Sequence, residues 1–221
     1  MKNKILLLPI FFISFSAFAQ SNIKLGVSAG ITNSTIQGDA SKSFEGLLDF
    51  TNGIATSRNH LGFYAGVNAD IPISSNVSVV PGIMYAQKGY EFSGSFNIKG
   101  LDFLGAGAKA VLQTEYIDVP VLIKAKLQGF QIFAGPQVSY LANANLKTTA
   151  GLLGINLLNK TMDATSQFNR WDMGITGGLA YEFSNGINIS GSYDYGLDKI
   201  DAGKNLNAYN RSFKIGIGMH F

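Results

Sequence analysis

The sequence predicts an all-β protein: an eight-stranded antiparallel up-and-down transmembrane β-barrel with short periplasmic turns and long outer loops. Apolar and polar residues alternate with period two in eight segments of 10 to 14 residues. Nearly every charged residue in these segments falls on the polar parity, and short and long connections alternate strictly between them. A soluble barrel or sandwich would instead turn its apolar face inward and its charges toward water.

The eight predicted strands are each long enough to cross a bilayer at a tilt. They are Asn22–Ile31, His60–Ile71, Val77–Lys88, Glu115–Leu127, Phe130–Leu141, Arg170–Phe183, Ile187–Leu197 and Tyr209–Phe221. The alternation is weakest in the third strand, where Val80 and Met84 fall on the polar parity. It is clearest in the last, where apolar side chains from Tyr209 to Phe221 alternate with polar residues and glycine.

The connections set the expected orientation. The short ones are Pro72–Asn76, Gln128–Gly129 and Ser184–Gly186, and the long ones are Thr32–Asn59, Gly89–Thr114, Ala142–Asn169 and Asp198–Ala208. Short connections of outer-membrane barrels are periplasmic. We therefore expect an outer-membrane protein with both termini in the periplasm.

Ten charged residues fall on the inferred interior face. They are Lys24, Lys88, Lys124, Lys126 and Lys214, opposed by Asp70, Asp118, Asp172, Glu182 and Asp194. We expect Lys24 to pair with Asp70, and Lys124, Lys126 and Glu182 to meet near the periplasmic end. Side chains fill the lumen of an eight-stranded barrel, so the set is interpreted as structural ion pairs rather than an ion pathway, and a diffusion pore is disfavoured.

The inferred lipid face carries two strand charges, Glu115 and Arg211, both near outer strand ends. Aromatic residues are expected to form two interfacial belts. The outer belt would comprise Tyr85, Tyr140, Trp171, Tyr195 and Tyr209, and the inner belt Phe130, Tyr181, Phe183 and Phe221.

Residues 1–19 have the pattern of a cleaved signal peptide, and residues 20–221 form the barrel domain. Lysines precede an apolar core, and Ala17 and Ala19 form a small-x-small cleavage site before Gln20. Lys2 and Lys4 are two of the 17 basic residues, which leaves 15 against 14 acidic residues. This balance gives no basis for nucleic-acid binding.

Candidates for catalysis are few, and we expect no enzyme activity, cofactor or metal. The chain has no Cys, which excludes disulfides and thiolate chemistry. His60 and His220 are predicted at opposite ends of the barrel, too far apart for a two-histidine metal site. An alternative is a lipid-modifying hydrolase in which His60, a serine at the rim and Asp118 or Asp172 form a triad.

Loops on a rigid scaffold are a common place for binding residues, so the outer loops are the expected functional surface. The third long loop is rich in apolar residues from Leu146 to Met162. These residues either contact a partner, the barrel mouth or a membrane surface, or pack on neighbouring loops.

Motifs distributed over the whole chain after residue 19 resemble those of the PorT-like outer-membrane β-barrel family of Bacteroidetes-type bacteria. They are Lys24–Val27, Pro81–Gly89, Tyr116–Lys124, Gly135–Gln137, Asp172–Gly174, Tyr193–Leu197 and the Gly-Met-His-Phe sequence at 218–221.

The resemblance implies an eight-stranded barrel in the outer membrane, in contact with its lipids, and brings no catalytic residues. One branch of the family takes part in protein secretion, so secretion components are candidate partners. Resemblance to outer-membrane barrels in general implies that the last strand is a recognition signal for the barrel-assembly machinery. The expected signal residues are Phe213, Ile215, Ile217, Met219 and Phe221.

Overall fold

The computed structural model describes residues 23–38, 54–97, 105–152, 155–203 and 207–221. The predicted signal peptide and its cleavage residues Ala17, Ala19 and Gln20 lie outside this range, so their role stays a prediction.

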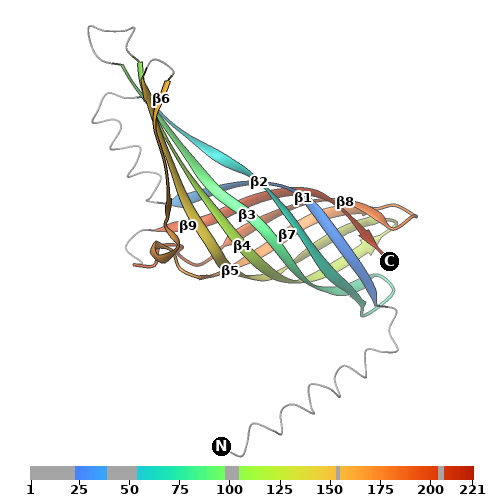
Figure 1. Cartoon of the computed structure of the whole chain (residues 1–221). Helices are drawn as coiled ribbons and strands as arrows, with labels where there is room; N and C mark the ends of the chain where they lie inside the picture. The colour runs from blue at the N-terminus through green and yellow to red at the C-terminus, as the bar shows by residue number, and fades with distance from the viewer. Residues whose placement is uncertain (1–22, 39–53, 98–104, 153–154, 204–206) are drawn as a thin grey trace, which may run out of the picture.

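Nine antiparallel strands and one short 3-10 helix, η2 (Thr165–Gln167), make up the described fold (Figure 1). The strands are β1 (Lys24–Gly38), β2 (Ile54–Pro72), β3 (Val77–Asn97), β4 (Gly105–Leu127), β5 (Phe130–Leu152), β6 (Ile155–Asp163), β7 (Trp171–Glu182), β8 (Ile187–Gly196) and β9 (Ala208–His220). None of the described helical segments is long and apolar enough to cross a membrane.

Eight of these strands close into a ring. Hydrogen bonds link them in the order β4-β3-β2-β1-β9-β8-β7-β5, and pairing of β4 with β5 completes the circle. The order follows the chain, apart from β6, which pairs with the far end of β5. The predicted eight-stranded up-and-down barrel is therefore confirmed, with β6 as an addition outside the ring.

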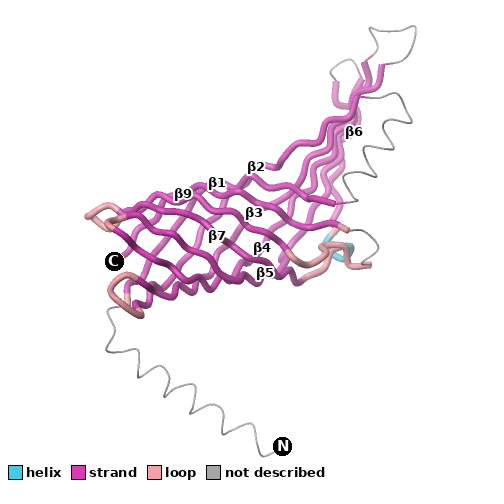
Figure 2. The backbone as a smooth tube through the Cα atoms, turned by 180° about the vertical axis from the view of Figure 1, so that it is seen from behind, coloured by secondary structure: helices cyan, strands magenta, loops and turns pink. Residues whose placement is uncertain are grey.

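Tight turns and the seam between the first and last strands define one end of the barrel. Gln128 and Gly129 both have positive φ, 47° and 92°, as a two-residue hairpin turn requires. Backbone hydrogen bonds of 3.1 and 2.9 Å between Leu25 and Phe221 close the seam at this end. The C-terminus lies at this end, opposite β6 (Figures 1 and 2). We call it the turn end.

Four strands of the ring, β2 to β5, continue beyond it and form one sheet with β6, here called the extension (Figure 2). It comprises residues 54–59, 89–97, 105–114, 143–152 and 155–163. The prediction that these residues are loops was wrong. The third long connection is instead the end of β5, β6 and η2. Residues 89–97 and 105–113 do alternate in sequence, but glycine, alanine and serine are so frequent there that the apolar signal is weak.

Two irregularities in pairing mark the boundary between barrel and extension. The register between β2 and β3 shifts between Asn59 and Tyr64, and that between β4 and β5 shifts between Glu115 and Tyr116. An extra residue on one strand bends it and increases its twist. The extension therefore leaves the cylinder of the barrel at this level, as Figure 2 shows.

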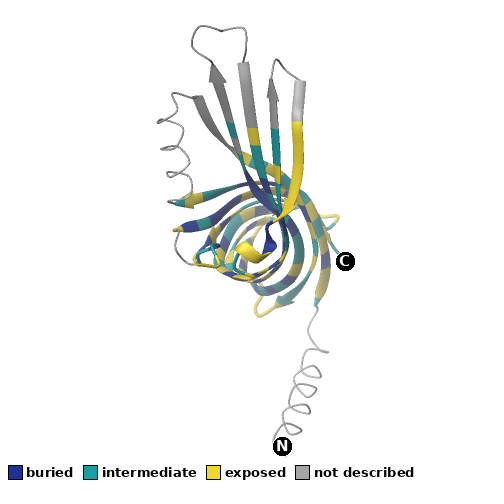
Figure 3. Ribbon diagram, turned by 60° about the vertical axis from the view of Figure 1, so that its left-hand side comes forward, coloured by how far each residue is buried: buried dark blue, intermediate teal, exposed yellow. Residues whose placement is uncertain are grey.

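The outer surface of the barrel is apolar on every strand. Exposed side chains include Leu25, Phe63, Ile83, Ile123, Ile132, Leu179, Ile189 and Ile217. The aromatic residues of the outer face contact each other in groups. Toward the extension, the ring centres of Tyr140 and Trp171 are 5.0 Å apart. Toward the turn end, the ring centres of Phe130 and Tyr181 are 4.9 Å apart. Buried and exposed residues alternate along the strands of the ring (Figure 3), as a polar lumen and a lipid-facing exterior require.

A lysine on this outer face tests where lipid lies. Ile175 on β7 and Leu158 on β6 are nearly equally exposed, 50% and 48%, but Ile175 lies on the barrel, midway between Trp171 and Tyr181 along β7, and Leu158 lies on the extension. Ile175→Lys should lower the free energy of unfolding in lipid vesicles by about 2–4 kcal/mol, because lysine at the bilayer midplane costs about that much. Leu158→Lys should change it by less than about 0.5 kcal/mol. If urea titrations give the same change in the free energy of unfolding for both variants, the two residues are in the same environment. This result would contradict the assignment of lipid to the barrel and water to the extension.

Candidate functional site

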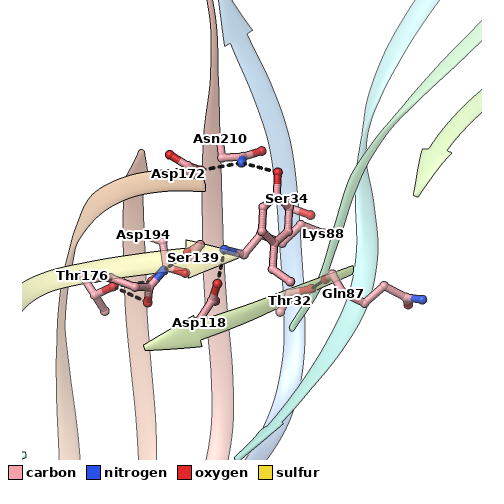
Figure 4. A network of polar contacts seen from close by, with 12 residues as sticks. Thr32, Ser34, Gln87, Lys88, Asp118, Ser139, Asp172, Thr176, Asp194 and Asn210 are labelled. Carbon is pink, nitrogen blue, oxygen red and sulfur yellow. Dashed lines mark hydrogen bonds and ion pairs between the residues drawn. The ribbon is translucent and has the colours of Figure 1, made fainter. Parts of the chain in front are cut away.

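Two lysines and two aspartates meet inside the barrel, and Figure 4 labels three of them, Lys88, Asp118 and Asp194. Asp118 accepts hydrogen bonds from Lys88 Nζ at 2.9 Å and from Lys214 Nζ at 3.2 Å. Lys214 Nζ also lies 2.6 Å from Asp194 Oδ2. All four side chains are buried, and their charges balance. We call Lys88, Asp118, Asp194 and Lys214 the ionic plug.

The plug crosses the barrel from wall to wall. Asp118 lies on β4 and Lys214 on β9, which are four steps apart in either direction around the ring of eight strands. Their contact therefore spans the diameter of the lumen. A second contact does the same, because Asn210 on β9 donates a hydrogen bond to the Tyr116 hydroxyl on β4 at 3.2 Å.

Polar side chains extend the plug on both sides. Thr176 Oγ1 lies 2.9 Å from both Asp194 Oδ1 and Gln137 Oε1. Asn210 donates to Asp172 Oδ2 at 2.7 Å. The Lys88 ammonium also lies 4.7 Å from the centre of the Tyr116 ring, a cation–π contact. Six strands thus contribute to one network that crosses the lumen at this level.

A second cluster lies at the turn end. Glu182 accepts hydrogen bonds of 2.7 Å from both Lys126 and Gln131, and its Oε2 lies 3.3 Å from His220 Nδ1. Lys124 forms an ion pair with Asp70. The expected meeting of Lys126 and Glu182 is therefore observed, while Lys124 turns to a different acid.

The predicted pairing of Lys24 with Asp70 was wrong. The two residues are register partners on β1 and β2, but Lys24 is at the first position of its strand and its side chain is exposed. Asp70 instead pairs with Lys124 from β4, one strand beyond its β3 neighbour. The partner of Asp70 is thus a lysine two strands away in the ring, and not Lys24 on the adjacent strand.

The end of the barrel near the extension is covered by packed chain. Tyr116, Leu141 and Ala144 form a buried apolar cluster with Phe168 against it. Residues that follow η2 are hydrogen-bonded to the segment after β8, through Asn169 N to Ile200 O at 2.7 Å and a bridge between Phe168 and Asp201. Side chains and backbone thus pack together at this end of the barrel.

Arg211 and Glu115 lie at the base of the extension, as expected for outer strand ends. Arg211 is nevertheless buried, because its guanidinium stacks on Tyr195 with 3.6 Å to the ring centre and donates to the Gly196 carbonyl at 2.7 Å. The Tyr195 ring thus covers the Arg211 guanidinium and separates it from the apolar surroundings.

The residues suggested for catalysis do not assemble into a triad in the described structure. His60 is the register partner of Ser34 and His220 that of Gly26 on β1, so the two histidines are about 26 Å apart along that strand. His60 Nε2 is buried with no hydrogen-bond partner. The two proposed acids are bonded elsewhere, Asp118 to lysines and Asp172 to Asn210. Among the described residues, no cluster of His, Asp and Glu is suited to hold a metal.

The proposed assembly-signal residues of β9 share the outer face. Phe213, Ile215, Ile217, Met219 and Phe221 are all exposed there, between β1 and β8.

A family model described as "Outer membrane protein beta-barrel domain" matches residues 18–202. The chain belongs to this family. The apolar outer face is thus the lipid-facing wall of an outer-membrane barrel, and the family assignment is general rather than specific to the PorT-like branch. No curated protein matches the chain.

Several solved outer-membrane proteins are similar to this barrel. The attachment invasion locus protein Ail of Yersinia pestis has 13% identity and a TM-score of 0.46, with 90% of this chain and 99% of Ail covered. OprG of Pseudomonas aeruginosa has 15% identity and a TM-score of 0.40, with 91% and 97% covered. Neisserial surface protein A has 10% identity and a TM-score of 0.40, with 89% and 97% covered.

Replacing Asp118 tests the ionic plug. Asp118→Ala would leave two buried lysines with one remaining acid, and should lower the free energy of unfolding in detergent micelles by about 3–5 kcal/mol, because breaking a buried pair leaves an uncompensated charge. The measurement is urea unfolding followed by tryptophan fluorescence.

A charge-balanced double variant provides the control. Asp118→Asn with Lys88→Met keeps the Lys214–Asp194 pair and restores neutrality, so it should be more stable than Asp118→Asn alone. If the double variant is the less stable one, charge balance is not what the plug contributes.

Proposed function

We propose that this protein is a non-enzymatic outer-membrane anchor that presents the extension to a protein partner outside the cell. In this proposal the turn end and both termini face the periplasm, because short connections lie there in outer-membrane barrels. The barrel supplies a closed, rigid base, and recognition takes place on the sheet above it.

The observation that carries the proposal is the exposure of β6. Within the described residues, β6 pairs with β5 alone, so one of its edges has no strand beside it. Residues 158–163 are exposed on both faces of the sheet, including the apolar Leu158 and Met162. An unpaired edge offers backbone donors and acceptors to an incoming strand.

The chemistry of β6 indicates the kind of partner. Leu158, Lys160 and Met162 are on one parity of the strand, with Asn159, Thr161 and Asp163 on the other. An extended segment with apolar residues at alternate positions, and an acid opposite Lys160, would match this edge by strand addition. The tip stands clear of the barrel, since nine residues of β6 span about 30 Å.

Site-specific photocross-linking in native outer membranes tests the edge. A photoreactive amino acid at Lys160 should give one discrete protein adduct, and the same group at Ile189 on the lipid face should not. Leu158→Asp with Met162→Asp should reduce the adduct at least about tenfold, on the scale of interface residues that anchor binding.

Ile73→Asp is the matched control, because Ile73 is an exposed apolar residue at the turn end and its substitution should leave the adduct unchanged. An adduct made only with lipid or lipopolysaccharide would contradict a protein partner. A component of a secretion machine in the adduct would favour the secretion role that the PorT-like resemblance implies.

We also propose that β9 carries the recognition signal for the barrel-assembly machinery. Phe221 and Phe130 are aromatic, almost equally exposed (70% and 68%), and both near the turn end. Phe221→Ala keeps the backbone hydrogen bonds to Leu25 that close the seam, so it removes the aromatic ring without opening the barrel.

Phe221→Ala should therefore lower the amount of assembled barrel in cells several-fold while leaving refolding of the purified protein in detergent unchanged. Phe130→Ala should leave both unchanged. The readout is the fraction of protein with the gel mobility of a folded barrel. Equal assembly of the two variants would refute a signal at Phe221.

A further inference from the structure

The lumen is packed in one half and open in the other. At the level of the ionic plug, inward side chains from six strands are buried; they are Thr32, Ala86, Asp118, Ser139, Asp194 and Ser212. Toward the turn end the packing is looser on part of the wall. Ser28, Met84, Phe133, Ser190 and Ser192 are only half-buried there, whereas Leu122 and Gln131 remain buried.

A cavity of about 100 Å³ lies in this looser half. Its wall on β3, β4 and β5 is largely apolar and includes Met84, Leu122 and Phe133. Its wall on β1, β2 and β8 is polar and includes Ser28, Asn68 and Ser190. The cavity has one apolar side and one hydrogen-bonding side, and its volume corresponds to roughly three water molecules.

The polar wall has hydrogen-bonding groups that the protein itself does not satisfy. Ser28 Oγ and Asn68 Oδ1 are buried atoms without a hydrogen-bond partner. Buried polar atoms of native proteins are almost always paired with protein or ordered water. Ser28 and Asn68 both line the cavity from neighbouring strands, so this wall offers hydrogen-bonding groups to a small polar guest.

The charges at the cavity select against an ionic guest. Two lysines contribute to the lining, Lys124 and Lys214. Lys124 is paired with Asp70, and Lys214 with Asp118 and Asp194. A charged guest would lose its hydration without gaining an unpaired counter-charge.

We propose that the half of the lumen near the turn end is a blind, solvent-filled pocket that binds water and small uncharged polar molecules, closed on its inner side by the ionic plug. Asn188 and His220, at the ends of β8 and β9, line the same cavity and lie at the turn end. Access is therefore from the turn end. The proposal does not depend on a partner for the extension.

Single cysteines test this directly, because the natural chain has none. Ser28→Cys and Ser190→Cys place a thiol on the polar wall, and Ser212→Cys places one in the packed half, where Ser212 is 1% exposed and its Oγ has no hydrogen-bond partner. Iodoacetamide is small and uncharged; it forms an S–C bond as iodide leaves and the thiol proton passes to buffer. Iodoacetate has nearly the same size and carries a negative charge.

In the folded protein in detergent, iodoacetamide should modify Ser28→Cys and Ser190→Cys at least about tenfold faster than Ser212→Cys, because thiol reactivity follows access. For the two pocket variants, the rate ratio of iodoacetate to iodoacetamide should be at least about tenfold lower than for the same variant unfolded in urea. Mass spectrometry measures each rate, and the gel mobility of the unboiled protein confirms that each variant is folded.

Each other outcome overturns part of the proposal. Pocket cysteines as slow as Ser212→Cys would show that the lumen is closed throughout. Equal fast reaction at all three positions would show that the plug does not end the pocket. If the rate ratio of iodoacetate to iodoacetamide is the same in the folded and the unfolded protein, the pocket does not discriminate against charge.

Discussion

The contact between Lys214 and Asp118 is the constraint on which the barrel depends most. It joins strands on opposite walls of a cylinder whose width is set by its eight strands. Charges in a low-dielectric interior need partners, so the neighbouring Lys88 and Asp194 are required by the same contact. The four charges of the ionic plug are thus paired with one another inside the barrel, while the outer face is apolar.

Much of this barrel could be predicted from alternation alone. Period two separates two faces, and the charges show which face is the lumen, so the eight strands and the inward position of the plug residues follow from the sequence. Which charges meet does not follow. Lys124 and Asp70 are separated by β3 in the ring, and a sequence pattern contains no information on distance across a lumen. For this reason, the prediction that Lys24 pairs with Asp70 on the adjacent strand was wrong.

The extension was missed for a different reason. Alternation identifies a strand when one face is apolar and the other charged, and residues 158–163 of β6 are exposed on both faces. Small residues around 105–110 weaken the contrast further. The sequence did mark the right region through the apolar residues from Leu146 to Met162, but not their conformation. An apolar segment predicted as loop between two barrel strands is thus a signal for a hairpin that continues the sheet.

β4 and β5 each run through 23 residues from a tight turn to the extension, and this continuity has a mechanical consequence. A load applied at the tip passes along covalent backbone into the barrel wall. There it acts parallel to the strands, so the hydrogen bonds between them resist in shear and share the force instead of opening one after another. The short turn at Gln128 and Gly129 joins the two strands at the far end, so neither can slide without the other. A force applied at the tip of the extension is therefore distributed over the barrel wall.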